Sequence, residues 1–251
     1  MRYETGLYQP VGIETLTPHT AGPTVEALLG PDYERAVRTN LLDCFAVSGG
    51  AIQHILCGEI KEIDANGAAV VGGFHHLPSA QHAEGTGEIW PDETNDPASG
   101  DDTRPYATLV MIQGHLKKSL RRAPQSRHTI QVPTLNSMFP RALSPLEVLE
   151  MIRQAYFSRN RASEVIEGPN RVVSLGVAPE TERSSAMTIK IVWDLLSEKI
   201  ISAVPELPAE EKARVRHMYN WQQIVPAAGR IALRGPGRYR TVRHAIHRQN
   251  R

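Results

Sequence analysis

The chain has 251 residues, of which 41% are hydrophobic and 22% are charged, and its formal net charge at pH 7 is +1. This length and composition are typical of a soluble globular protein with a substantial core, in one large domain or two small ones. A net charge so close to zero does not select a polyanionic partner, and two cysteines, Cys44 and Cys57, exclude a disulfide framework.

The sequence also bears on the cellular location of the protein. It has no run of about 18 apolar residues, so we expect no transmembrane helix and no membrane partner. Residues 1–5 lack the basic start and apolar core of a signal peptide. We therefore expect a cytoplasmic protein, or one that is secreted or delivered by a non-classical route.

The first 40 residues predict an N-terminal arm or cap. Residues 1–23 are rich in Pro, Gly and Thr, which disfavour regular structure. Residues 24–30 predict a short helix with Thr24 as its N-cap and Gly30 as its stop. Residues 32–38 predict a second short helix, capped by Asp32.

Two apolar segments marked by glycine follow, and each contains histidine. They are residues 53–60 (Gln-His-Ile-Leu-Cys-Gly-Glu-Ile) and residues 72–78 (Gly-Gly-Phe-His-His-Leu-Pro). The Asn66-Gly67 dipeptide between them favours a tight type I′ turn, so we predict one hairpin that carries both histidines. Glycines at 72 and 73 allow a close approach of the backbone to a ligand or an unusual φ, and a bulge is the alternative.

His54 and His75 are candidates for proton transfer. Histidine exchanges protons near neutral pH, and two of them brought together can act as the general base and general acid of one reaction. The alternative is two ordinary histidines in a hairpin, and the spacing of 21 positions alone favours that alternative.

Two charged segments come next. Residues 84–102 contain seven acids and no Lys or Arg, and we interpret them as a solvated acidic loop, not as a catalytic carboxylate pair. After a strand predicted at 107–112, a basic segment is either a solvated face or a contact for phosphates. Its residues are His115, Lys117, Lys118, Arg121, Arg122, Arg127 and His128.

The remaining elements predict an α+β protein, with N-terminal helices followed by antiparallel sheets and a packed helix. Ser144 followed by Pro145 and Glu147 is a strong helix start, and apolar residues then recur at helical spacing up to Tyr156. Strands are predicted at 171–177, at 187–193, where alternation is strict, and at 200–205.

Residues 206–251 predict a basic C-terminal extension. No acid follows Glu211, whereas Lys212 and nine arginines follow it, with Tyr219, Trp221 and Tyr239 among them. Basic residues interleaved with aromatic rings suit single-stranded nucleic acid. A solvated or partner-bound tail that balances the acidic loop is the equal alternative.

The histidine segments and two later segments resemble the EndoU-like endoribonucleases, and within them the bacterial branch. Residues 54–59 and 72–75 resemble the paired-histidine signature of that family. Residues 137–140 resemble its Phe-Pro step before a helix, and residues 200–205 resemble its late strand of the form Ile-x-Thr/Ser-x-Tyr-Pro. The resemblance covers residues 41–205, which we take as the catalytic domain, and implies an EndoU-like nuclease fold.

The resemblance implies a function and a set of site residues. His54 and His75 are implied as the acid–base pair of a metal-independent endoribonuclease that cleaves single-stranded RNA to 2′,3′-cyclic phosphate and 5′-hydroxyl ends. Ser202, Ser137 and Gly73 are implied as substrate-binding positions, with neither a cofactor nor a metal. His76 is not the motif histidine, and a structural or RNA-contacting role is expected for it.

Two positions depart from the family pattern. The family's catalytic lysine usually stands shortly before the Phe-Pro step, where this chain has residues 134–136 (Thr-Leu-Asn), and the family's stacking tyrosine falls at Val204. A cation that stabilises the charged phosphorane is usually a large contribution. Other residues can supply that charge, and the candidates are Lys117, Lys118, Arg127, His128 and Arg141.

Three functions therefore compete. The first is a transphosphorylating ribonuclease, either a toxin with an immunity protein as partner or an RNA-processing enzyme. The second is a degenerate member of the same fold that binds RNA through its basic tail without cutting it. The third is a metal-dependent hydrolase with His54, His75, His76 and His82 as ligands, which the spacing supports only weakly.

Overall fold

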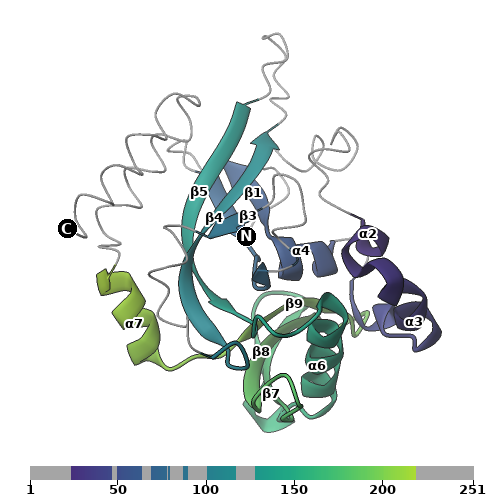
Figure 1. Cartoon of the computed structure of the whole chain (residues 1–251). Coiled ribbons are helices and arrows are strands. Elements are labelled where there is room, and N and C mark those ends of the chain that lie inside the picture. Colours follow the sequence, from purple (N-terminus) through teal and green to yellow (C-terminus); the bar gives the residue numbers. More distant parts are fainter. Residues whose placement is uncertain are drawn as a thin grey trace.

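The computed structural model describes residues 24–46, 50–63, 69–77, 79, 87–89, 101–116 and 128–218. In these residues the protein is a mixture of helices and antiparallel sheets, which confirms the predicted α+β class (Figure 1). The described strands form three sheets, with two, three and four strands. Every helix in the described ranges is too short or too polar to cross a bilayer.

Two short helices open the described chain. Helix α2 (Val25–Leu29) begins as predicted, because the Thr24 hydroxyl accepts a hydrogen bond from the amide of Ala27 at 3.1 Å. After the 3₁₀ turn η1 (Gly30–Asp32), helix α3 (Tyr33–Arg38) follows. The predicted side-chain cap at Asp32 is wrong, because Asp32 already has helical dihedral angles and makes no capping bond.

The structure corrects the predicted hairpin around His54. Ala51–Cys57 is helix α4, and the hairpin consists only of β1 (Glu59–Ile63) and β2 (Ala69–Gly72). A short apolar run is compatible with a buried helix as well as with a strand, and nearly every residue of α4 is buried. The expected Asn66-Gly67 turn lies outside the described residues.

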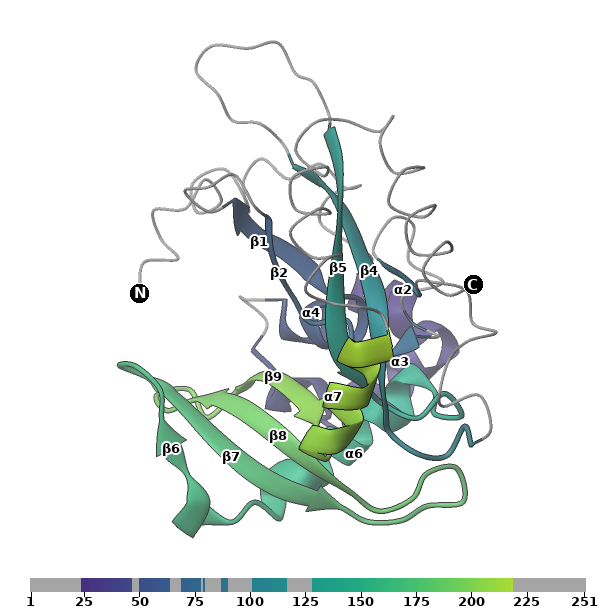
Figure 2. The same ribbon diagram turned by 90° about the vertical axis from the view of Figure 1, so that its left-hand side faces the viewer.

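A long hairpin stands beside the short one. Strands β4 (Tyr106–Leu116) and β5 (His128–Met138) pair along their whole length (Figure 2). Strand β3 (Gly87–Ile89) pairs with β4. The rest of the acidic loop up to residue 100, and residues 117–127 of the basic segment, lie outside the described residues.

The four-stranded sheet is covered on one face by α6 (Pro145–Phe157). Its strands run in the order β6 (Val165–Ile166), β7 (Arg171–Ala178), β8 (Met187–Asp194) and β9 (Ile200–Pro205). Helix α6 starts with the predicted capping box, in which Ser144 and Glu147 bond each other's backbone amides. Strand β8 alternates buried and half-buried side chains, as predicted.

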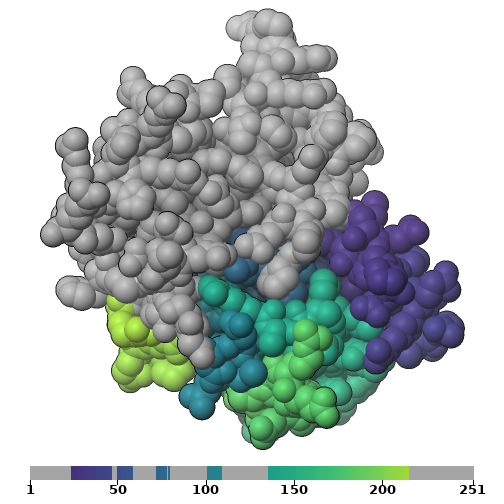
Figure 3. Space-filling view, in the orientation of Figure 1, coloured from purple at the N-terminus to yellow at the C-terminus, as the bar shows by residue number. Residues whose placement is uncertain are grey.

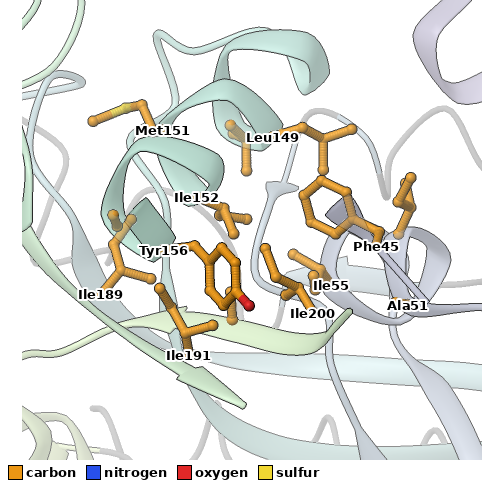
Figure 4. Close-up of a cluster of buried hydrophobic side chains, with 14 of the residues drawn as sticks. Phe45, Ala51, Ile55, Leu149, Met151, Ile152, Tyr156, Ile189, Ile191 and Ile200 are labelled. Atoms are coloured by element: carbon orange, nitrogen blue, oxygen red, sulfur yellow. The ribbon is translucent and has the colours of Figure 1, made fainter. Parts of the chain in front are cut away.

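One hydrophobic core joins these parts. Side chains of α6 such as Leu149 and Ile152 are fully buried against α4, β8 and β9 (Figure 4). Leu29 and Ala36 of the N-terminal helices belong to the same core. The 3₁₀ turns η2 (Leu42–Cys44) and η4 (Arg161–Ser163) connect the elements.

Helix α7 (Ala209–Met218) follows β9 and contacts the long hairpin. The carboxylate of Glu211 accepts a hydrogen bond from the amide of Ala107 on β4 at 3.2 Å. In the space-filling view the described residues run from the N-terminal helices (purple) to α7 (yellow-green) along the lower part of the molecule (Figure 3). The assignment of residues 1–40 and 206–251 as separate units remains a prediction.

Gly176 sets the distance between β7 and α6. A Cβ atom at this position would lie 1.9 Å from the carbonyl oxygen of Ala155, so any side chain there forces the helix off the sheet. We expect Gly176→Ala to lower the free energy of unfolding by about 3 kcal/mol or more. The neighbouring Val177, whose side chain is exposed, is the control, and Val177→Ala should cost about 1 kcal/mol or less. Urea unfolding measures both, and equal effects of the two variants would contradict this packing.

Candidate functional site

Main-chain hydrogen bonds bring His54 and His75 together. The amide of Phe74 donates to the carbonyl of His54 at 3.0 Å, and the amide of His75 donates to the carbonyl of Ile55 at 2.8 Å. These bonds attach the segment that follows β2 to the last turn of α4. Two histidines that are 21 positions apart in the sequence therefore come from adjacent backbone segments.

Gly73 makes this attachment possible. Its φ is +74°, and a Cβ atom there would lie 1.8 Å from the carbonyl oxygen of His54. The close approach expected at this glycine is therefore made to the chain's own helix, and a contact of Gly73 with substrate remains a prediction. The next residue, Phe74, also has a positive φ of 64° and is fully buried. Such backbone costs on the order of 1–3 kcal/mol and persists only where its surroundings hold it.

Asn136 holds this strained segment from β5. Its side-chain amide donates to the carbonyl of Gly73 at 2.6 Å and to the carbonyl of Phe74 at 2.9 Å. Asn136 lies within the three residues where the family pattern places its lysine. Sequence reasoning did not identify this role, because the contact joins residues 63 positions apart, and no local pattern reports it.

His54 is anchored by a hydroxyl group. Its ring is buried, with 8% of the residue exposed, and its Nε2 lies 3.1 Å from the Oγ atom of Ser202 on β9. A hydroxyl both donates and accepts, so Ser202 can hold the neutral and the protonated imidazole in the same place. Ser202, which we expected to bind substrate, therefore also orients His54.

His75 is anchored by a carbonyl group. Its Nδ1 lies 2.9 Å from the carbonyl oxygen of Ser137 on β5, and its own carbonyl accepts a bond from the amide of Phe139 at 2.7 Å. A carbonyl can only accept, so Nδ1 carries the hydrogen, and Nε2 carries the lone pair of the neutral ring. Ser137 contributes its main chain to this bond, and its side chain is buried.

His76 is a structural residue. It is fully buried, its Nδ1 lies 2.6 Å from the Ser79 hydroxyl, and its Nε2 lies 2.9 Å from the Leu143 carbonyl. Burial lowers the pKa of His76 from 6.5 to about 4, and the bond to Leu143 and the charge of Glu147 oppose this shift only in part. The structure therefore favours the structural alternative for His76 over contact with RNA.

The structure brings the five candidate residues into one region. Its members are His54, His75, Ser202, Ser137 and Gly73. Strand β5, which carries Ser137, is in direct contact with β9, which carries Ser202. This arrangement can give and take protons on a bound substrate. Substrate contacts of Ser202, Ser137 and Gly73 remain predictions.

The expected sources of positive charge are not confirmed at this site. Lys117, Lys118 and Arg127 lie outside the described residues, and His128 begins β5 at the end paired with Leu116. The guanidinium of Arg141 is engaged with Tyr106, with its Nε 3.1 Å from the phenol oxygen and its carbon 4.9 Å from the ring centre.

No metal site is found in the part of the chain that the structure describes. Within it, no three or more His, Cys, Asp or Glu side chains gather as a metal ion requires. Both ring nitrogens of His76 are already bonded to protein groups, so His76 is not a ligand. His82, the fourth residue of the metal hypothesis, lies outside the described residues.

The lowered pKa of His76 predicts that the folded protein loses stability in acid. The unfolded chain takes up a proton at His76 as the pH falls through about 6.5, whereas the folded protein does so only near pH 4. The stability that His76 contributes is therefore complete above pH 6.5 and declines between 6.5 and 4, by on the order of 3 kcal/mol. We expect His76→Gln to be less stable than the wild type at pH 7 and to approach it at pH 4. Urea unfolding at several pH values tests this, and parallel pH profiles of the two proteins would contradict it.

The chain matches the model of a known protein family. The family model described as bacterial EndoU nuclease matches residues 48–207, which is more than half of the chain. Comparison with curated proteins and with solved structures gives no match. The matched range contains α4, the His75 segment, β5 and β9, and thus every residue of the site. The chain belongs to the bacterial EndoU nuclease family.

Proposed function

We propose that the protein is a metal-independent endoribonuclease that cleaves single-stranded RNA by transphosphorylation. The observation that carries this proposal is the pair of buried imidazoles anchored in different ways, His54 on a hydroxyl and His75 on a carbonyl. Membership of a nuclease family supports the nuclease activity, and the chemistry of the two anchors supports the reaction type.

The proposed reaction needs two proton transfers and no other reactant. The ribose 2′-oxygen attacks the adjacent phosphorus and gives its proton to one imidazole. The bond between phosphorus and the 5′-oxygen breaks, and the other imidazole protonates that leaving oxygen. The products are a 2′,3′-cyclic phosphate end and a 5′-hydroxyl end. One ring must start neutral and the other protonated. Each of the two proton transfers is expected to raise the reaction rate by about 10²- to 10⁴-fold.

The anchors suit these two tasks. Because the Ser137 carbonyl accepts the hydrogen of Nδ1, Nε2 is the basic nitrogen of the neutral His75 ring. The Ser202 hydroxyl can follow His54 through both protonation states. Both rings are almost fully buried, which limits competition by bulk water.

A binding-only role is the second candidate. It is favoured by Val204, which has no ring to stack on a base, and by the absence of lysine at residues 134–136. In that case the protein binds single-stranded RNA without turnover, and its affinity depends on residues 212–251.

The proposed partners follow from the activity. Single-stranded RNA is the substrate. A ribonuclease delivered as a toxin must be restrained in the cell that makes it, and in that role we propose an immunity protein as the second partner.

The decisive experiment is cleavage of a single-stranded RNA in EDTA with analysis of the end groups. We expect cyclic phosphate ends from the wild type, and a loss of about 100-fold or more in His54→Ala and in His75→Ala. Arg38→Met, at an exposed position of α3, is the control and should cleave like the wild type.

The outcomes separate the candidates. Undiminished cleavage in both histidine variants contradicts the proposal. RNA binding without cleavage by the wild type supports the binding-only role. Cleavage that EDTA abolishes and a transition metal restores supports the metal-dependent hydrolase.

A further inference from the structure

The face of the four-stranded sheet that is turned away from α6 continues directly from the site. Ile189, Ile191 and Trp193 of β8 are buried in the core. By alternation, Lys190 and Val192 therefore point to the opposite face. Figure 2 shows α6 behind β7 and β8, so that this opposite face is turned to the viewer.

The strand register places Lys190 beside Ser202. One row across the sheet consists of Val173, Val192 and Ser202, and the next row consists of Leu175, Lys190 and Val204. Residues that are opposite one another have their Cβ atoms roughly 4.5–5.5 Å apart, and diagonal neighbours are roughly 7–8 Å apart. Lys190 is therefore the direct neighbour of Val204 and the diagonal neighbour of Ser202.

The Lys190 side chain is long enough to reach the hydroxyl that anchors His54. Its four-carbon stem carries the ammonium about 5 Å from Cβ, which covers most of the diagonal distance to Ser202. The Ser202 hydroxyl is itself 3.1 Å from Nε2 of His54.

The ammonium of Lys190 has no counter-ion in the described part of the chain. Lys190 is half-buried, and within the described residues it forms no hydrogen bond or ion pair. Its neighbours across the sheet, Leu175 and Val204, are apolar. Glu206, which is opposite Thr188, is the other diagonal neighbour of Lys190 on β9, and its carboxylate pairs with Lys212 at 3.7 Å. A half-buried cation that has no ion pair among the described residues favours a bound anion.

We propose that Lys190 binds the scissile phosphate of the substrate and is a further catalytic residue, an inference that rests on the proposed function. As the 2′-oxygen attacks, negative charge grows on the non-bridging oxygens of the phosphorus. The two imidazoles move protons, and the ammonium of Lys190 stabilises that charge. No bond to Lys190 forms or breaks.

The test compares Lys190→Met, which keeps the length of the stem, with Lys190→Arg, which keeps the charge. The control is Arg38→Met, which removes one positive charge from the exposed end of α3. Two quantities are measured in EDTA: kcat/KM for a single-stranded RNA, and the affinity for its uncleavable 2′-O-methyl form at several salt concentrations. Thermal unfolding shows that each variant is folded.

We expect Lys190→Met to lose about 100-fold or more in kcat/KM, and Lys190→Arg to recover at least a tenth of the wild-type value. The salt dependence of RNA affinity in Lys190→Met should fall by about 0.7 in log–log slope, as expected for one lost phosphate contact with a single strand. Arg38→Met should change neither quantity.

Cleavage by Lys190→Met within about threefold of the wild type would overturn the inference. If the wild type does not cleave, the proposed function fails. The salt dependence of RNA affinity then tests by itself whether Lys190 binds a phosphate. In that case an unchanged salt slope, or no RNA binding by the wild type, overturns the role of Lys190 as well.

Discussion

The site depends on two main-chain hydrogen bonds between the last turn of α4 and the segment after β2. The carbonyls of His54 and Ile55 accept these bonds from Phe74 and His75. Helix ends leave carbonyls without partners inside the helix, and here His75 satisfies the carbonyl of Ile55. The carbonyl of His54 also accepts a bond from the amide of Gly58 at 3.1 Å, so that Phe74 is its second donor. Only glycine fits at position 73, because any Cβ would overlap the His54 carbonyl. The glycine near the second histidine is thus a condition for bringing the two rings together.

Three histidines lie close in this part of the fold, and their environments give them different properties. His76 has both nitrogens bonded inside the core, and its lowered pKa of about 4 keeps it neutral at ordinary pH. Nε2 of His54 lies beside a hydroxyl of β9, and Nδ1 of His75 lies beside a carbonyl of β5. Adjacent residues in the sequence, His75 and His76, therefore have separate tasks, which only their hydrogen-bond partners reveal.

The sequence predicted the elements whose signals are local. The capping box at Ser144 and the alternation of β8 report their own structure, and both predictions are confirmed. Helix α4 was predicted as part of a hairpin, because a short buried apolar run has no period that separates helix from strand. Asn136 and Lys190 could not be placed, because their positions depend on a contact 63 residues away and on the register of three strands.

The two anchors belong to different sheets, and this makes the site sensitive to the core. Strand β5 of the three-stranded sheet holds His75, whereas β9 of the four-stranded sheet holds His54 through Ser202. Lys190 lies on the second sheet too, so it keeps its position relative to Ser202, the anchor of His54, even if the sheets shift. A displacement between the sheets therefore moves Ser137, the anchor of His75, relative to Ser202, the anchor of His54. The shared core of α4, α6 and β9 packs the helix that carries His54 against the sheet that carries Ser202.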